Sequence, residues 1–116
     1  MDNDIEQKTF DFSVRVVNLY KYLCSSKQEY TMSKQLLKCG TSIGANVAES
    51  QNAQSNNDFV SKLSIALKET AETKYWLKLL LETEYISKAE FDSIYNDCDE
   101  IYRIISSIII TSKDKL

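Results

Sequence analysis

Both glycines of this chain stand inside one stretch with helical periodicity. Residues 34–50 read KQLLKCGTSIGANVAES, in which Gly40 and Gly44 are four residues apart and Ala48 follows four residues later. Glycine inside a helix costs roughly 0.5–1 kcal/mol relative to alanine, so two glycines on one helical face need a compensating contact. A stripe without large side chains lets a neighbouring backbone come close. We therefore expect this helix to pack tightly on at least one partner helix.

The rest of the composition also favours long helices. The 116 residues include no proline and only these two glycines, whereas β-sheet proteins need turn residues often. Hydrophobic residues make up 43% and charged residues 27%, as in ordinary globular domains. The length suits one core, so we expect a single domain over residues 1–116.

Hydrophobic periodicity predicts four helices. Residues 1–8 are polar, and we expect them to be frayed. A wide apolar face in the first helix combines a main stripe with a second stripe. The second stripe consists of Phe10, Val14, Val17 and Cys24. The expected bounds are Thr9–Ser26, Thr31 to residues 51–54, Ser55–Glu82, and Ser87 onward. Short connections between such helices predict an all-α, antiparallel up-down four-helix bundle.

Three polar residues are expected to cap these helices. Thr31 is the expected N-cap of the second helix. Ser55 has Asp58 three residues later, which resembles a capping box with Asp in place of Glu. Ser87 and Glu90 have the full capping-box pattern.

The last two helices have regular apolar seams. The seam of the third helix consists of Phe59, Leu63, Ala66, Thr70, Thr73, Leu77 and Leu80. The seam of the fourth helix consists of Phe91, Ile94, Cys98, Ile101, Ile105 and Ile108. Four further apolar residues of the last helix lie off its seam: Tyr95, Tyr102, Ile104 and Ile109. This excess suggests contact with another subunit, the alternative being a terminus that folds over its own bundle.

The chain lacks the residues that the common catalytic and metal-binding sites require. The chain has no histidine, which removes Ser-His-Asp and Cys-His arrangements and His-based metal sites. Residues 40–44 lack the Lys-Ser/Thr of a phosphate-binding loop. We expect no enzymatic activity, no cofactor and no metal.

The cysteines and the first residues indicate the cellular compartment of the protein. The chain has three cysteines, an odd number, and no two of them are close in sequence: Cys24, Cys39 and Cys98. Buried core thiols are the expectation, and a catalytic or metal-binding role is the alternative. The acidic opening, Met1 to Glu6, has no apolar signal-peptide region. We expect a reduced, cytoplasmic protein without membrane segments.

A polar row accompanies the glycine stripe. Ser42, Asn46 and Glu49 share one helical face, at spacings of four and three residues. Asn46 and Glu49 belong either to a site facing a groove or ring lumen, or to interhelical hydrogen bonds with Lys68, Thr73 or Lys74. Trp76 is expected to anchor the core or an oligomer interface, and ligand stacking is the alternative.

Six lysines of the two central helices are candidates for binding nucleic acid. They are Lys34, Lys38, Lys62, Lys68, Lys74 and Lys78. Within residues 34–78 they are opposed by four acids, whereas the whole chain has a net charge of −3. They form either a weak phosphate-binding surface or a solvated lysine-rich face.

Two motifs resemble a known family. GTSIGANVAES at residues 40–50 and DFVSKLSIALKETAETKYWLKLL at residues 58–80 resemble the small bacterial four-helix-bundle proteins encoded in intervening sequences of 23S ribosomal RNA genes. The resemblance implies an up-down bundle that assembles into a ring-like homopentamer. It also implies relatedness to the accessory protein of diversity-generating retroelements, which binds a reverse transcriptase and uses a basic surface for nucleic acid. The acidic net charge of this chain departs from that relative.

Two functions follow as hypotheses. The first is a non-enzymatic, homo-oligomeric bundle that acts as a protein-interaction or scaffold module. The alternative is an accessory protein that binds RNA or DNA and pairs with a reverse transcriptase.

Overall fold

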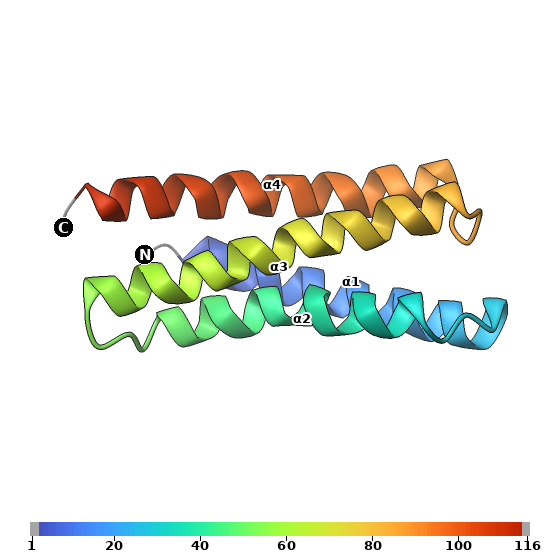
Figure 1. Ribbon diagram of the computed structural model, residues 1–116, viewed down its shortest axis with the longest axis horizontal. Coiled ribbons are helices and arrows are strands. Elements are labelled where there is room, and N and C mark those ends of the chain that lie inside the picture. Colours follow the sequence, from blue (N-terminus) through green and yellow to red (C-terminus); the bar gives the residue numbers. More distant parts are fainter. Residues whose placement is uncertain (1–2, 115–116) are drawn as a thin grey trace.

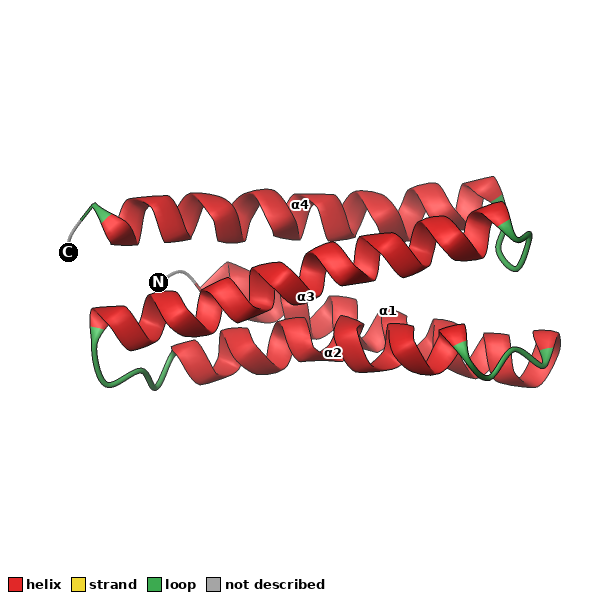
Figure 2. Ribbon diagram, in the orientation of Figure 1, coloured by secondary structure: helices red, strands yellow, loops and turns green. Residues whose placement is uncertain are grey.

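The computed structural model describes residues 3–114, which fold into four helices. They are α1 (Asn3–Lys27), α2 (Met32–Ser50), α3 (Asn56–Glu82) and α4 (Lys88–Lys113), and the described residues contain no strand. The helices lie side by side in a rod of 47 × 20 × 20 Å, with connections at alternating ends (Figure 1). Short loops join them (Figure 2). The chain is therefore all-α, and its helices run up and down as the sequence predicts.

Each helix has two neighbours around the bundle. α2 packs on α1 and α3, α3 packs on α4, and α4 closes the circuit through a smaller contact with α1. Ion pairs strengthen that last contact. Arg15 pairs with Asp97, and Lys8 Nζ lies 2.8 Å from Glu100 Oε1.

The core follows the predicted seams with two local corrections. In α3, Val60 is buried and Phe59 is only half-buried. In α4, Ile109 is buried and the predicted Ile108 is half-buried, so the last turn presents the next residue to the core. An α-helix has 3.6 residues per turn, so a strict seven-residue pattern drifts around a long helix. The seam therefore shifts by one position at each of these two ends.

α1 begins earlier than the sequence indicated. The expected start was Thr9, but the helix is continuous from Asn3. Ile5 is 1% exposed and Thr9 is fully buried, so the first turns pack on the core. Burial of Ile5 compensates for the polar composition around it. The expectation of frayed residues is thus wrong from Asn3 onward, and residues 1–2 lie outside the described part.

The start of α2 also differs from the prediction. Thr31 is not a side-chain cap: its hydroxyl makes no capping hydrogen bond, and its backbone is already helical, with φ −95° and ψ −59°. The buried carboxylate of Glu29 does this work instead. It accepts hydrogen bonds from the backbone N–H groups of Thr31, Met32 and Ser33, at 3.1, 3.1 and 2.7 Å. These are donors that a helix start otherwise leaves without partners.

The other two caps follow their sequence signals. The Ser55 hydroxyl accepts a hydrogen bond from the Asp58 N–H at 3.0 Å. The Asp58 carboxylate accepts from Gln54 N–H, one residue earlier than a closed capping box requires. Ser87 and Glu90 form the complete box, with distances of 3.1 and 2.8 Å.

Candidate functional site

The glycine stretch of α2 lies against α1. A Cβ atom at Gly40 would be 2.8 Å from both methyl carbons of Val16. A Cβ atom at Gly44 would be 3.1 Å from the carbonyl oxygen of Thr9 and from the hydroxyl of Ser13. The contacts at Gly40 are closer than a Cβ atom allows, and at Gly44 a Cβ atom would require the neighbouring atoms of α1 to shift by a few tenths of an ångström. The bare backbone of α2 is thus the surface on which α1 docks.

The polar row beside the glycines has local partners. The Asn46 amide donates to the Ser42 carbonyl oxygen at 2.9 Å, inside the same helix. Glu49 is exposed and lies 3.7 Å from Lys62 of α3. Neither residue pairs with Lys68, Thr73 or Lys74, so that part of the expectation is wrong. Short side chains such as Asn46 often bond to their own helix when its carbonyl groups are within reach.

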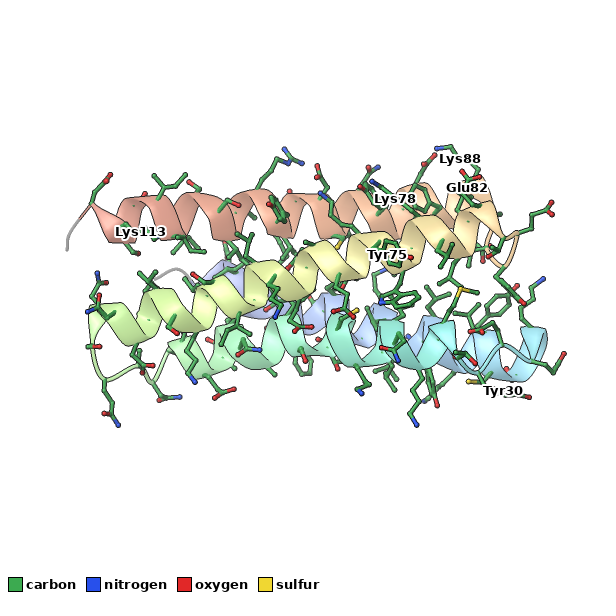
Figure 3. The ribbon with its side chains drawn as sticks, viewed as in Figure 1. Tyr30, Tyr75, Lys78, Glu82, Lys88 and Lys113 are labelled. Atoms are coloured by element: carbon green, nitrogen blue, oxygen red, sulfur yellow. The ribbon has the colours of Figure 1, made fainter. Side chains whose placement is uncertain are left out.

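Trp76 and Tyr75 separate into an inner and an outer aromatic residue. Trp76 is half-buried against the core, and its indole N–H donates to the Glu72 carboxylate at 3.1 Å. Tyr75 is 57% exposed and meets the Trp76 ring edge-on, with 5.0 Å between ring centroids. Figure 3 places Tyr75 on α3. Trp76 therefore packs within this bundle, and Tyr75 is available to the surroundings.

A groove runs along the outer seam of α1 and α2. Its volume is about 860 Å³, and its lining is mainly small: Ser13, Thr41, Gly44, Ala45 and Ala48, with Phe10, Asp4, Glu6 and Gln7 at its margin. Phe10 is 63% exposed and Val14 is 47% exposed. The Ser13 and Thr41 hydroxyls donate to their own helices, at 3.1 Å to Thr9 and 2.7 Å to Leu37. The groove is therefore apolar in character.

Phe10 and Val14 are the surface residues that sequence reasoning misplaced. They belong to the second apolar stripe, which was assigned to a wide core-facing surface. In the structure they point outward, while Ile5, Phe12 and Val16 fill the core. Their spacing placed them together on one face of the helix. Which of two adjacent faces is buried depends on where α2 and α4 pack.

α4 exposes less apolar surface than its composition suggested. Ile104 and Ile108 are half-buried and pack against the core, and Ile109 is buried. Ile110 is 63% exposed. The apolar excess of this helix is thus largely used inside the bundle.

The six lysines do not gather on one surface. Lys62 reaches Glu49 of α2, whereas Lys74 reaches Asp99 of α4 at 2.7 Å, so these two project to opposite sides of α3. Lys74 also lies 4.7 Å from the centre of the Tyr102 ring. The remaining four are exposed, on α2 or α3: Lys34, Lys38, Lys68 and Lys78 (Lys78 is labelled in Figure 3).

The acidic cluster of α4, which consists of Asp97, Asp99 and Glu100, forms ion pairs with basic residues of α1 and α3. The hydrogen bond from Lys74 lowers the pKa of Asp99, and the hydrogen bond from Lys8 lowers the pKa of Glu100. Asp97 pairs with Arg15, whose guanidinium also donates to the Ser93 hydroxyl at 2.9 Å. These acids join α4 to α1 and α3.

The core thiols are poor nucleophiles. Burial raises the pKa of Cys39 to about 11 and that of Cys98 to about 12. Both are therefore protonated at neutral pH, and the thiolate is the reactive form. Within residues 3–114, no three His, Cys, Asp or Glu side chains cluster so as to hold a metal ion.

The fold and its surface define a small all-α bundle with an apolar groove between α1 and α2. The chain belongs to the family described as 23S rRNA-intervening sequence protein, whose pattern matches residues 1–107. It is similar to a solved structure from Bacteroides thetaiotaomicron VPI-5482, a protein with unknown function from the S23 ribosomal protein family. The two are 53% identical and superpose with a TM-score of 0.90, over 90% of this chain and 97% of that one. Comparison with curated proteins gives no match.

The lengths and hydropathies of the four described helices bear on whether any of them could span a membrane. None combines the length and the apolar character required to cross a bilayer.

Proposed function

We propose that this protein is a non-enzymatic, self-associating helical bundle that serves as an interaction or scaffold module. The observation that carries the proposal is the apolar α1/α2 groove with its exposed Phe10 and Val14. Exposed apolar surface next to a complete core is typical of protein–protein contact sites.

The chemistry of the bundle supports a non-catalytic role. The chain has no histidine, and its two buried thiols are held protonated. The acids of α4 have cationic partners on neighbouring helices. An interaction module needs a rigid scaffold and an accessible surface, and no nucleophile or base.

The family suggests the form of the assembly. The resemblance in residues 40–80 implies a ring-like homopentamer, and we adopt a homo-oligomer with a five-fold ring as the proposed state. We also propose a cytoplasmic location, because all three cysteines are free thiols, which suits a reducing compartment.

Light scattering coupled to size-exclusion chromatography tests self-association. The expected result is a particle several times the 13.3 kDa of one chain. A single protomer at micromolar concentration and moderate salt would overturn the proposal. A pull-down from the source cells would then identify protein partners of the assembled form.

Nucleic-acid binding is the alternative, and the exposed Lys34 and Lys38 are the observation in its favour. Two of the other candidate lysines, Lys62 and Lys74, have acidic partners, which reduces the positive surface. A mobility-shift titration with RNA and DNA at low and moderate salt separates the two functions. Binding at moderate salt would favour the alternative, and no binding even at low salt would exclude it.

A further inference from the structure

The groove between α1 and α2 has a floor of small side chains. The floor consists of Ser13, Thr41, Gly44, Ala45 and Ala48. Both of its hydroxyl groups donate to carbonyl oxygens of their own helices. A large apolar side chain that entered the groove would therefore leave neither of these donors without a partner. The groove is open to an apolar occupant that is larger than its own lining.

The two ends of the groove differ in charge. Glu6 lines the groove at the end where α1 begins. Lys34 lies on the same side of α2 as the floor residues, which follow it at spacings of seven, eleven and fourteen residues. Gly40 lies beside Val16 in the antiparallel pair, so Lys21 of α1 is level with Lys34. The groove is therefore acidic at one end and leads toward a basic pair at the other.

These three charged side chains have no ion-pair partner within residues 3–114. Glu6 is half-buried, whereas Lys21 and Lys34 are exposed. Glu49, near the end of α2, is directed toward Lys62 of α3 and does not belong to the groove. A charged group that loses water when the apolar surface beside it is covered needs a partner of opposite sign. An occupant of the groove must therefore bring a cation to Glu6.

A second copy of the chain does not supply such an occupant. Two α1/α2 faces laid together would set one floor of small side chains against the other and leave the groove unfilled. The large apolar residues that are exposed beyond α1 are scattered: Tyr30, Ile65, Tyr75 and Ile110. Ile65 and Tyr75 share α3, but ten residues separate them, which places them on different sides of the helix. These residues remain available for contacts between copies.

We propose that the groove binds an amphipathic helix of a partner protein. This helix carries large apolar side chains on one face, a basic residue at the end near Glu6 and an acidic residue at the end near Lys21 and Lys34. A groove recognises such a helix through apolar anchors at spacings of three and four residues. The inference rests on the proposed role as an interaction module, and it specifies the chemistry of the partner.

The charged ends also set the length and direction of the partner helix. Glu6 and Lys21 are fifteen residues apart on α1, or about 22 Å at 1.5 Å per residue. A helix of about four turns spans this distance. Acidic residues stabilise the start of a helix and basic residues stabilise its end. The partner helix therefore begins near Lys34 and ends near Glu6, parallel to α2.

A designed peptide tests the site in the full chain. The probe is a fluorescein-labelled helical peptide of about 18 residues, with leucines at spacings of three and four residues, glutamates in its first turn and arginines in its last turn. Fluorescence anisotropy measures its dissociation constant. Ala45→Phe fills the groove from an exposed position and should weaken binding at least about tenfold. Ala71→Phe, at an exposed position of α3, is the matched control and should leave binding unchanged.

Charge exchange tests the acidic end of the groove. Glu6→Lys should also weaken binding of this peptide at least about tenfold. Glu82→Lys makes the same change of charge at an exposed residue of α3 and should have no effect. A second peptide with glutamates in place of the arginines should show the opposite preference and bind the Glu6→Lys variant more tightly than the parent. Circular dichroism verifies that all variants retain their helices.

Three results would overturn the inference and leave self-association intact. They are no saturable binding by the parent up to about 1 mM peptide, unchanged binding by Ala45→Phe, and equal binding by the Glu6→Lys and Glu82→Lys variants. Light scattering with the peptide present adds a fourth test. A parent assembly that dissociates as the peptide binds would show that another copy occupies the groove, which also contradicts the inference. A monomeric parent that binds the peptide would overturn only the proposed self-association.

Discussion

Val16 of α1 occupies the space that a side chain at residue 40 of α2 would need. Both methyl carbons of Val16 would lie 2.8 Å from a Cβ atom on Gly40, closer than real Cβ contacts allow. Val16 is fully buried, so neither helix can yield without disturbing the core. The pairing of the smallest residue with a β-branched one sets how closely α1 and α2 approach.

Gly40→Ala should therefore destabilise the protein. Overpacking of a filled core costs about 1–3 kcal/mol, and the better helix propensity of alanine returns roughly 0.5–1 kcal/mol. We expect a net loss of about 1 kcal/mol in the free energy of unfolding, measured by urea denaturation. The same substitution in a Val16→Ala background should cost less, because the clash is removed. Equal costs in both backgrounds would contradict the assigned contact.

Removing the Glu29 carboxylate should destabilise the start of α2. Its three backbone hydrogen bonds make it the functional cap, and loss of a cap typically costs about 0.5–2 kcal/mol. Glu29→Ala is expected to lower the urea midpoint by a corresponding amount. Thr31→Ala is the matched control, because the Thr31 hydroxyl makes no capping bond. A larger effect at Thr31 than at Glu29 would reverse the assignment.

Stability should fall in acid through the carboxylates that face lysines. The pKa values of Asp99 and Glu100 are lowered in the folded state, by hydrogen bonds from Lys74 and Lys8 respectively. A lowered folded pKa gives stability that is present above the unfolded pKa and is lost as the pH falls through the folded pKa. The free energy of unfolding should thus be higher at pH 7 than at pH 3. The double variant D99N/E100Q should show a shallower decline, measured as urea midpoints across that range, and an unchanged slope would argue against these two groups.

The three cysteines should differ in reactivity. Cys39 and Cys98 are buried with raised pKa values of about 11 and about 12, whereas Cys24 is half-buried. In the folded protein at pH 8, a thiol reagent should modify Cys24 first and leave the other two unreacted. All three should react in concentrated urea. Rapid native modification of Cys39 or Cys98, located by mass spectrometry, would show that the core opens more readily than its packing indicates.

Much of the fold follows from local patterns in the sequence. Apolar side chains at spacings of three and four residues predict the helices and most of each buried face, because this periodicity can be read within each segment alone. Ser55 and Ser87 cap their helices as predicted, because capping depends on residues within one turn. The motifs in residues 40–80 also sufficed to indicate the family.

Other features depended on how the helices meet. Glu29 caps α2 because the turn before the helix brings its carboxylate within hydrogen-bond distance of three N–H groups. The sequence pattern instead favoured Thr31, which is a common type of N-cap residue. Phe10 and Val14 became surface residues because α1 rotates its Ile5–Phe12–Val16 side toward the core.

The glycine stripe shows the same division within one motif. The sequence alone determined that the bare backbone at residues 40 and 44 must face a close neighbour. Two glycines on one face destabilise the helix, and only a contact with another helix can offset that cost. Only the tertiary structure decided that α1 is the helix that approaches, and that Lys62 of α3 reaches α2 whereas Lys74 reaches α4. Helix formation depends on neighbours along the chain, whereas the choice of partner depends on the simultaneous packing of all four helices.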